Sequence, residues 1–169
     1  MLHIAEVTTA EQLDSVRDLM RAFVAWHRRR HGADLALIDR YFDAPAFEAE
    51  LAALPGKYDR PWGRLLLAAY ADQPAGCVAL RELAVGVCEM KRMFVYPQLQ
   101  GKGIGRALAE SLIAAARSAG YAAMRLDTSV RQAEALHLYR RLGFQRIDPY
   151  YELAPDLQRW LIFMELRLA

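Results

Sequence analysis

The sequence is poor in cysteine, since Cys77 and Cys88 are the only two among 169 residues. This count excludes a disulfide framework and a zinc site built mainly from cysteine. Both cysteines fall in segments with strand character, where a small buried side chain is the usual interpretation, so we expect two buried free thiols. The four histidines show no mutual spacing of metal ligands, and we expect no metal site.

The chain also lacks a strong excess of charge and a long apolar run. Its 22 Lys and Arg residues and 20 Asp and Glu residues give a net charge of +2. The one basic run, Arg28–Arg30, is more typical of a helix end than of a nucleic-acid site. No apolar stretch approaches the roughly 18 residues of a membrane span, and the first residues do not resemble a targeting segment. We therefore expect a cytoplasmic protein with neither nucleic acid nor membrane as a partner.

What the sequence does contain is the composition of a folded globular chain. Apolar residues make up 54% and charged residues 25%, a balance that supports a hydrophobic core. At 169 residues, without a linker or internal repeat, residues 1–169 are expected to form a single domain.

Hydrophobic periodicity predicts an alternation of strands and helices. Capping-box spacings mark two helix starts, at Thr8 or Thr9 (with Glu11 or Gln12) and at Ser129 (with Gln132). The predicted order is strand 2–7, helix 10–30, helix 39–53, strands 64–71, 75–83 and 87–96, helix 103–119, strand 121–128, a helix ending at 142, and strands 144–147 and 161–168. This order predicts an α/β fold (an α+β mixed sheet): an antiparallel meander followed by a strand-helix-strand crossover, with helices on both faces.

The segment with the clearest chemistry is a glycine-rich turn between the strand 87–96 and the following helix. Glycines at 101, 103 and 105 allow the backbone to approach a ligand and leave the first amides of the helix unpaired. The helix N-terminus is partly positive, and Lys102 and Arg106 add two cations. The turn therefore predicts a site for a ligand that carries phosphates.

Two common phosphate-binding motifs do not fit this turn. A Walker loop needs Ser or Thr after its lysine, but Gly103 follows Lys102. A dinucleotide fingerprint would gain support from Asp127, which ends the next strand about 20 residues on. However, Arg106 and Leu108 stand where its third Gly or Ala belongs, so the spacing excludes it.

The turn instead resembles motif A of the GNAT superfamily of N-acetyltransferases, which reads Arg or Gln, two residues, Gly, one residue, Gly or Ala. Residues 100–105, Gln-Gly-Lys-Gly-Ile-Gly, match every position. Residues 91–97 resemble that family's fourth strand, and residues 135–144 resemble its motif B. The resemblance covers about residues 89–144 and implies a GNAT-like fold.

The resemblance implies acetyl-CoA as acetyl donor and names the residues that would bind it. The pyrophosphate would lie on the turn, and the pantetheine arm would pair with the backbone of Met93 and Val95 like an added strand. The Val95 amide would then polarise the thioester carbonyl. Gln132 stands where many members have an asparagine that contacts pantetheine. The full set of implied donor-binding residues is Met93, Phe94, Val95, Gln100, Gly101, Lys102, Gly103, Ile104, Gly105, Arg106 and Gln132.

Two residues are candidates for proton transfer. Tyr139 occupies the position of the motif B tyrosine, which in many members is the general acid for the departing thiolate; otherwise it is a core aromatic. Glu89 lies six residues before Val95, and the even spacing places both on one strand face. The histone-acetylating branch has its base glutamate at the matching offset. Glu89 could instead pair with Lys91 or Arg92, and water would then replace it.

The resemblance predicts an acetyl-CoA-dependent N-acetyltransferase that moves an acetyl group to a primary amine. The sequence does not identify the acceptor: a small amine, an amino acid, an aminoglycoside and a peptide N-terminus all remain. The sequence also does not decide whether the protein forms a homodimer. The alternative is a noncatalytic acyl-CoA-binding sensor with the same fold, and the presence of both Glu89 and Tyr139 favours the enzyme.

Overall fold

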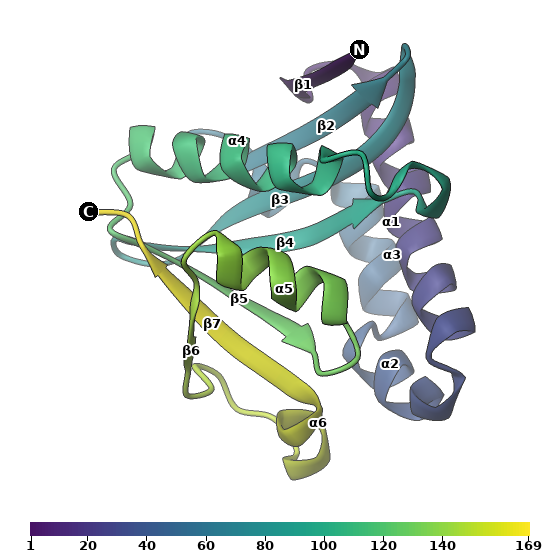
Figure 1. Ribbon diagram of the computed structural model, residues 1–169, viewed down its shortest axis with the longest axis vertical. Coiled ribbons are helices and arrows are strands. Elements are labelled where there is room, and N and C mark those ends of the chain that lie inside the picture. Colours follow the sequence, from purple (N-terminus) through teal and green to yellow (C-terminus); the bar gives the residue numbers. More distant parts are fainter.

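A seven-stranded mixed sheet forms the centre of the computed structural model, which describes residues 1–169 (Figure 1). The strand order is β1-β2-β3-β4-β5-β7-β6, and β4–β5 is the only parallel pair. This confirms the predicted meander and crossover. The strands are β1 (Leu2–Glu6), β2 (Arg64–Tyr70), β3 (Gln73–Ala84), β4 (Val87–Val95), β5 (Ala123–Ser129), β6 (Gln145–Ile147) and β7 (Leu161–Arg167).

Helices cover both faces of the sheet, as the amphipathic patterns predict. Figure 1 shows α4 and α5 in front of the strands and α1, α2 and α3 grouped on the other side. One hydrophobic cluster lies under α4 and α5, and a second lies between the sheet and α1 to α3. The helices are α1 (Ala10–Arg30), α2 (Leu35–Tyr41), α3 (Ala44–Ala53), α4 (Ile104–Ser118), α5 (Ala133–Arg141) and α6 (Pro155–Trp160). None of them combines the length and the apolar composition needed to cross a membrane.

The region before β2 differs from its prediction. The single helix predicted over 39–53 is two helices, α2 and α3, which meet at Asp43. Pro45 follows Asp43 by two residues, and proline cannot donate the hydrogen bond that a continuous helix would need there. Asp43 instead caps α3, with its carboxylate accepting from the Ala46 amide at 3.3 Å. The short helix α6 was not predicted.

The start of α5 also differs. The capping box predicted for Ser129 and Gln132 is absent, because α5 begins at Ala133 and Gln132 makes no side-chain cap bond. Ser129 is the last residue of β5, paired with Leu161 of β7, and this pairing keeps it in the sheet. Its hydroxyl accepts from the Arg131 amide instead. The predicted free thiols are confirmed: both cysteines are buried and unpaired, and burial raises the pKa of each to about 12.

A β-bulge interrupts β4. Two residues of β4 separate Lys91 from Phe94, whereas only one residue of β3 separates their partners, and Arg92 adopts a φ of 59°. An extra residue reverses the alternation of side chains beyond it. Met90 and Val95 consequently pack in the same cluster under α4 although an odd number of positions separates them. The prediction that Glu89 and Val95 share a face is therefore wrong.

The capping box at the start of α1 is confirmed at Thr9, whose hydroxyl accepts from the Gln12 amide at 3.2 Å. We expect Thr9→Ala to lower the free energy of unfolding by about 1 kcal/mol, since it leaves that amide without its cap. Thr8→Ala is the matched control, because the Thr8 hydroxyl caps no backbone amide and only donates a long hydrogen bond of 3.4 Å to Gln12 Oε1. Urea unfolding of both variants tests this, and equal losses would contradict the assignment of the cap.

Candidate active site

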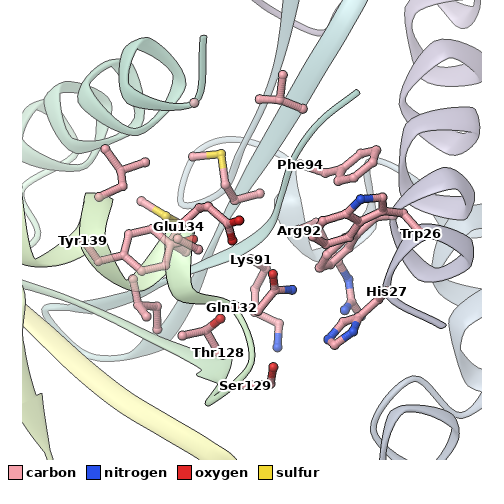
Figure 2. A pocket seen from close by; sticks show the side chains of 18 of the residues that line it. Trp26, His27, Lys91, Arg92, Phe94, Thr128, Ser129, Gln132, Glu134 and Tyr139 are labelled. Atoms are coloured by element: carbon pink, nitrogen blue, oxygen red, sulfur yellow. The ribbon is translucent and has the colours of Figure 1, made fainter. Parts of the chain in front are cut away.

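A cavity of about 430 Å³ lies at the carboxyl ends of β4 and β5. These strands pair over only three positions, and the last pair is Glu89 with Arg125. Beyond it the two ribbons separate in Figure 1, while β5 stays paired with β7 through Ser129. Side chains of α1, β4, β5 and α5, together with the glycine turn, line the gap (Figure 2).

The glycine turn forms one end of this cavity. The amides of residues 101–106 donate to no acceptor in the protein, and the first bond of α4 runs from Ala107 to Gly103. Gly101 and Gly103 have φ values of 80° and 78°, and a Cβ on either would meet no atom within 4 Å. The glycines are thus required by backbone conformation, and the space above them is open to a ligand. Consecutive free amides at the start of a 15-residue helix suit an anion.

Two members of the predicted phosphate site, Gln100 and Lys102, are placed differently from the expectation. The Gln100 amide donates to the Pro97 carbonyl at 3.3 Å, so it is not one of the free amides. Lys102 does not line the cavity, and its Nζ lies 5.5 Å from the centre of the Tyr70 ring. Arg106 does line it, in an exposed ion pair with Glu110.

The edge of β4 faces the gap with free backbone groups. Tyr96 donates to the Ala75 carbonyl of β3, so antiparallel alternation turns the polar groups of Val95 and Met93 away from β3. On that side β5 has already diverged. The Val95 carbonyl accepts from the Gln100 side chain at 3.2 Å, and the Val95 amide remains open to the cavity. This arrangement provides an edge for an extended ligand and one donor at its end.

Tyr139 lies on the α5 wall of the cavity, as Figure 2 shows. Its ring packs against Phe144 at 5.8 Å between centroids, and only 6% of the residue is exposed. Its hydroxyl makes no hydrogen bond to the protein. Burial raises the pKa of Tyr139 well above its ordinary value of 10, so the phenol keeps its proton at neutral pH. Gln132, the residue that precedes α5, also lines the cavity without using its side-chain amide in the protein.

Glu89 is placed differently. It is 1% exposed and does not belong to the lining of the cavity. One carboxylate oxygen accepts from Arg81 Nε at 2.8 Å, and the other accepts from the Tyr150 hydroxyl. Its base role stays a prediction, and the geometry gives it structural partners on both oxygens.

The wall opposite α5 is aromatic. It comes from α1, the end of α2 and the end of α6: Phe23, Trp26, His27, Tyr41, Phe42 and Trp160. Phe94 joins it, because beyond the bulge its ring points toward Phe23 and Trp26, at 5.3 and 6.0 Å between centroids. Helical spacing of aromatic residues signals a buried face, but it does not show that part of the face borders a cavity.

Two of the four histidines, His27 and His31, form a close pair. His27 lies in the last turn of α1 and His31 is the residue that caps its C-terminus, with the two ring centroids 4.9 Å apart. No group of three or more His, Cys, Asp or Glu side chains is arranged to hold a metal ion.

The diverging parallel strand pair, the free amides of the glycine turn and the open edge of the fourth strand together form a site for an extended ligand that carries an anionic group. The chain matches the acetyltransferase (GNAT) family over residues 35–144. The protein belongs to the GNAT acetyltransferase family, and the resemblance seen in its motifs is confirmed.

Individual proteins agree with this membership. An uncharacterized N-acetyltransferase of Schizosaccharomyces pombe is 32% identical over 152 residues, which cover 89% of this chain and 86% of the relative. A GNAT-family acetyltransferase of Staphylococcus aureus has a similar structure, with a TM-score of 0.75, 18% identity and full coverage of both chains. The PaiA N-acetyltransferase of Thermoplasma acidophilum, solved with coenzyme A, gives a TM-score of 0.72 at 16% identity over 99% of each chain.

His27 makes the stability of the fold sensitive to acid. Burial lowers its pKa from 6.5 to about 4, and its Nδ1 has no hydrogen-bond partner. The unfolded chain takes up a proton near pH 6.5 and the folded chain only near pH 4, so this contribution is present above pH 6.5 and lost as the pH falls toward 4. The loss amounts to at most about 3 kcal/mol.

We therefore expect His27→Phe to reduce the difference in unfolding free energy between pH 7 and pH 4.5. Chemical unfolding at both pH values measures it, and His3→Gln, at an exposed position of β1, is the control. An unchanged pH dependence in His27→Phe would show that folding does not shift the pKa of His27.

Proposed function

We propose that the protein transfers the acetyl group of acetyl-CoA to a primary amine by direct attack of the amine on the thioester. The observation that carries the proposal is the alignment, along one cavity, of the free amides of residues 101–106, the open Val95 amide and the Tyr139 hydroxyl. The first would bind the pyrophosphate, and the second would meet the thioester carbonyl. The third would lie beside the sulfur.

Two of these groups, the Val95 amide and the Tyr139 hydroxyl, would lie where a negative charge develops during the reaction. The amine nitrogen forms a bond to the carbonyl carbon, and the carbonyl oxygen becomes negative beside the Val95 amide. When the carbon–sulfur bond breaks, the thiolate takes the Tyr139 proton, and the amine loses one proton to a base. Tyr139 suits this step because its hydroxyl is protonated and has no competing partner in the protein.

Three alternatives exist for the group that accepts the proton of the amine. Glu89 would have to give up the Arg81 or the Tyr150 hydrogen bond to accept a proton. A water chain or a substrate that arrives as the free amine remains the alternative. A noncatalytic acyl-CoA sensor would use the same turn, but it would not need an open space between Tyr139 and the aromatic wall.

The first test concerns the turn. CoA and 3′,5′-ADP should stabilise the fold, by about 2.7 kcal/mol at 100 times the dissociation constant, and NAD and ATP should do so much less. Gly103→Val should abolish the effect, since its side chain is strained at a φ of 78° and occupies the open space over the amides.

Gly120→Val is the matched control for this test. Gly120 has a φ of 90° and an equally open Cβ position at the other end of α4. The Gly120→Val variant should lose stability because valine is strained at this positive φ, and it should keep its stabilisation by CoA in thermal unfolding. Equal stabilisation by NAD, or an undiminished response of Gly103→Val, would contradict the cofactor assignment.

The second test concerns proton transfer. Tyr139→Phe should lower turnover by about 100- to 10,000-fold, because it removes the proton donor and keeps the ring. Acetyl-CoA affinity and stability should change little. Tyr121→Phe is the control: its hydroxyl, also buried, donates to the Trp62 carbonyl at 2.8 Å, so its loss should cost stability and spare turnover.

Glu89→Gln belongs in the same experiment. If Glu89 is the base, the rate should fall most at pH values where the amine is an ammonium, and raising the pH should restore part of it. Full activity of Tyr139→Phe would reduce Tyr139 to a core aromatic. An unchanged pH profile for Glu89→Gln would assign the base to water or substrate.

A further inference from the structure

Five charged side chains line the cavity, and three of them have close ion-pair partners. Arg92 is bound by Glu50 at 2.9 and 3.1 Å. On the rim, Arg106 pairs with Glu110, and Glu134 pairs with Arg30. Since His27 is neutral at pH 7, the charges without such a partner are those of Lys91 and Asp127.

Lys91 and Asp127 stand on opposite sides of the diverging strands. Glu89 and Arg125 form the last pair of β4 and β5, and Lys91 and Asp127 follow two residues further on along each strand. Both lie on the face toward α1 and α2, since their neighbours Met90 and Leu126 pack in the cluster under α4. Continued pairing would have made them cross-strand neighbours. Instead they form no ion pair, and the cavity opens between the two strands.

The Lys91 ammonium has no hydrogen bond to the protein although only 16% of its side chain is exposed. Its nearest carboxylate oxygen belongs to Glu89, at 4.0 Å, and that carboxylate already accepts from Arg81 and Tyr150. The Tyr41 ring lies 5.7 Å from Nζ. Figure 2 shows Lys91 between the residues of α5 and those of α1. The 4.0 Å ion pair with Glu89 compensates part of the Lys91 charge, but it leaves the three N–H donors of the ammonium free for a further anion.

The Asp127 carboxylate has the complementary arrangement. It accepts from the hydroxyls of Tyr41 and Tyr151, one on each oxygen, and no cation lies within 4.0 Å of it. Neutral donors fix its orientation and leave its charge uncompensated. Each oxygen keeps a further lone pair, and Asp127 lines the cavity. The same cavity therefore offers an anion for an ammonium on β5 and a cation for a carboxylate on β4.

On this basis we infer that the acceptor is an α-amino acid with an apolar side chain. Lys91 binds its carboxylate, Asp127 binds its amino group, and the side chain lies against the wall of Phe23, Trp26 and Trp160. The inference rests on the proposed function and specifies its acceptor. Decarboxylated amines and longer peptides lack the carboxylate beside the amine, and polyamines would place a second cation near Lys91.

The test compares amino acids with amines that differ only by the carboxylate: phenylalanine with 2-phenylethylamine, and leucine with 3-methylbutylamine. Thiol release from acetyl-CoA and the mass of the product are followed. We expect kcat/KM to favour each amino acid by roughly 10- to 100-fold, the range of one charge-assisted hydrogen bond. Lys91→Met should abolish the preference by slowing the amino acids alone, whereas Asp127→Asn should slow both classes.

Arg146→Met, on exposed β6, removes a cation elsewhere and should change neither class. CoA-dependent stabilisation of every variant shows that the fold and the donor site survive.

Phenylalanine binding to the CoA-loaded protein is measured separately by calorimetry. A preference for the decarboxylated amines, or one that persists in Lys91→Met, overturns the inference and leaves the acetyltransferase intact. Lys91-dependent binding of phenylalanine without turnover of any amine supports the acceptor site and overturns the proposed function. Absence of that binding overturns the acceptor site.

Discussion

The divergence of β4 from β5 is the constraint on which the rest of the site depends. In a parallel pair, continued backbone hydrogen bonding would seal the space between the strands. Here the pairing ends at Glu89 and Arg125, and the backbone groups of Met93 and Val95 stay available on the open edge. The gap, the helix start beside it and the aromatic wall opposite are therefore parts of a single cavity.

The bulge at Arg92 assigns the side chains of β4 to the two sides of this gap. Before it, Met90 faces α4; after it, Met93 and Val95 do so. Its positive φ is held by strong local contacts, since the Arg92 guanidinium binds Glu50 and lies over the rings of Phe42 and Phe47. The bulge thereby links α3 to the strand edge that meets the thioester in the proposed reaction.

The two sides of the sheet have different tasks in this arrangement. The side of α4 and α5 supplies the glycine turn, Gln132 and Tyr139, which would hold the donor and protonate its thiolate. The side of α1, α2 and α6 supplies aromatic rings and the two charges on the diverging strands, which would select the acceptor. Glu89 lies on this second side, but its hydrogen bonds make it part of the support for Tyr150 and Arg81.

The secondary-structure elements around the proposed donor site are predictable from the sequence, because the information that forms them is local. Helical and strand periods, the glycine turn and the cap at Thr9 act within a few residues, and the motif places Tyr139 on a helix that starts beside the gap. The sequence signal for the break between α2 and α3 is also local, since it lies in Asp43 and Pro45, although the prediction of one helix over 39–53 does not use it. Only the tertiary structure decided the acceptor side. A bulge depends on the register between β3 and β4, so strand alternation alone predicts the wrong face for Glu89 relative to Val95. Lys91 and Asp127 line one cavity because they lie on two strands, more than 25 residues apart in the sequence, whose pairing stops before it reaches them.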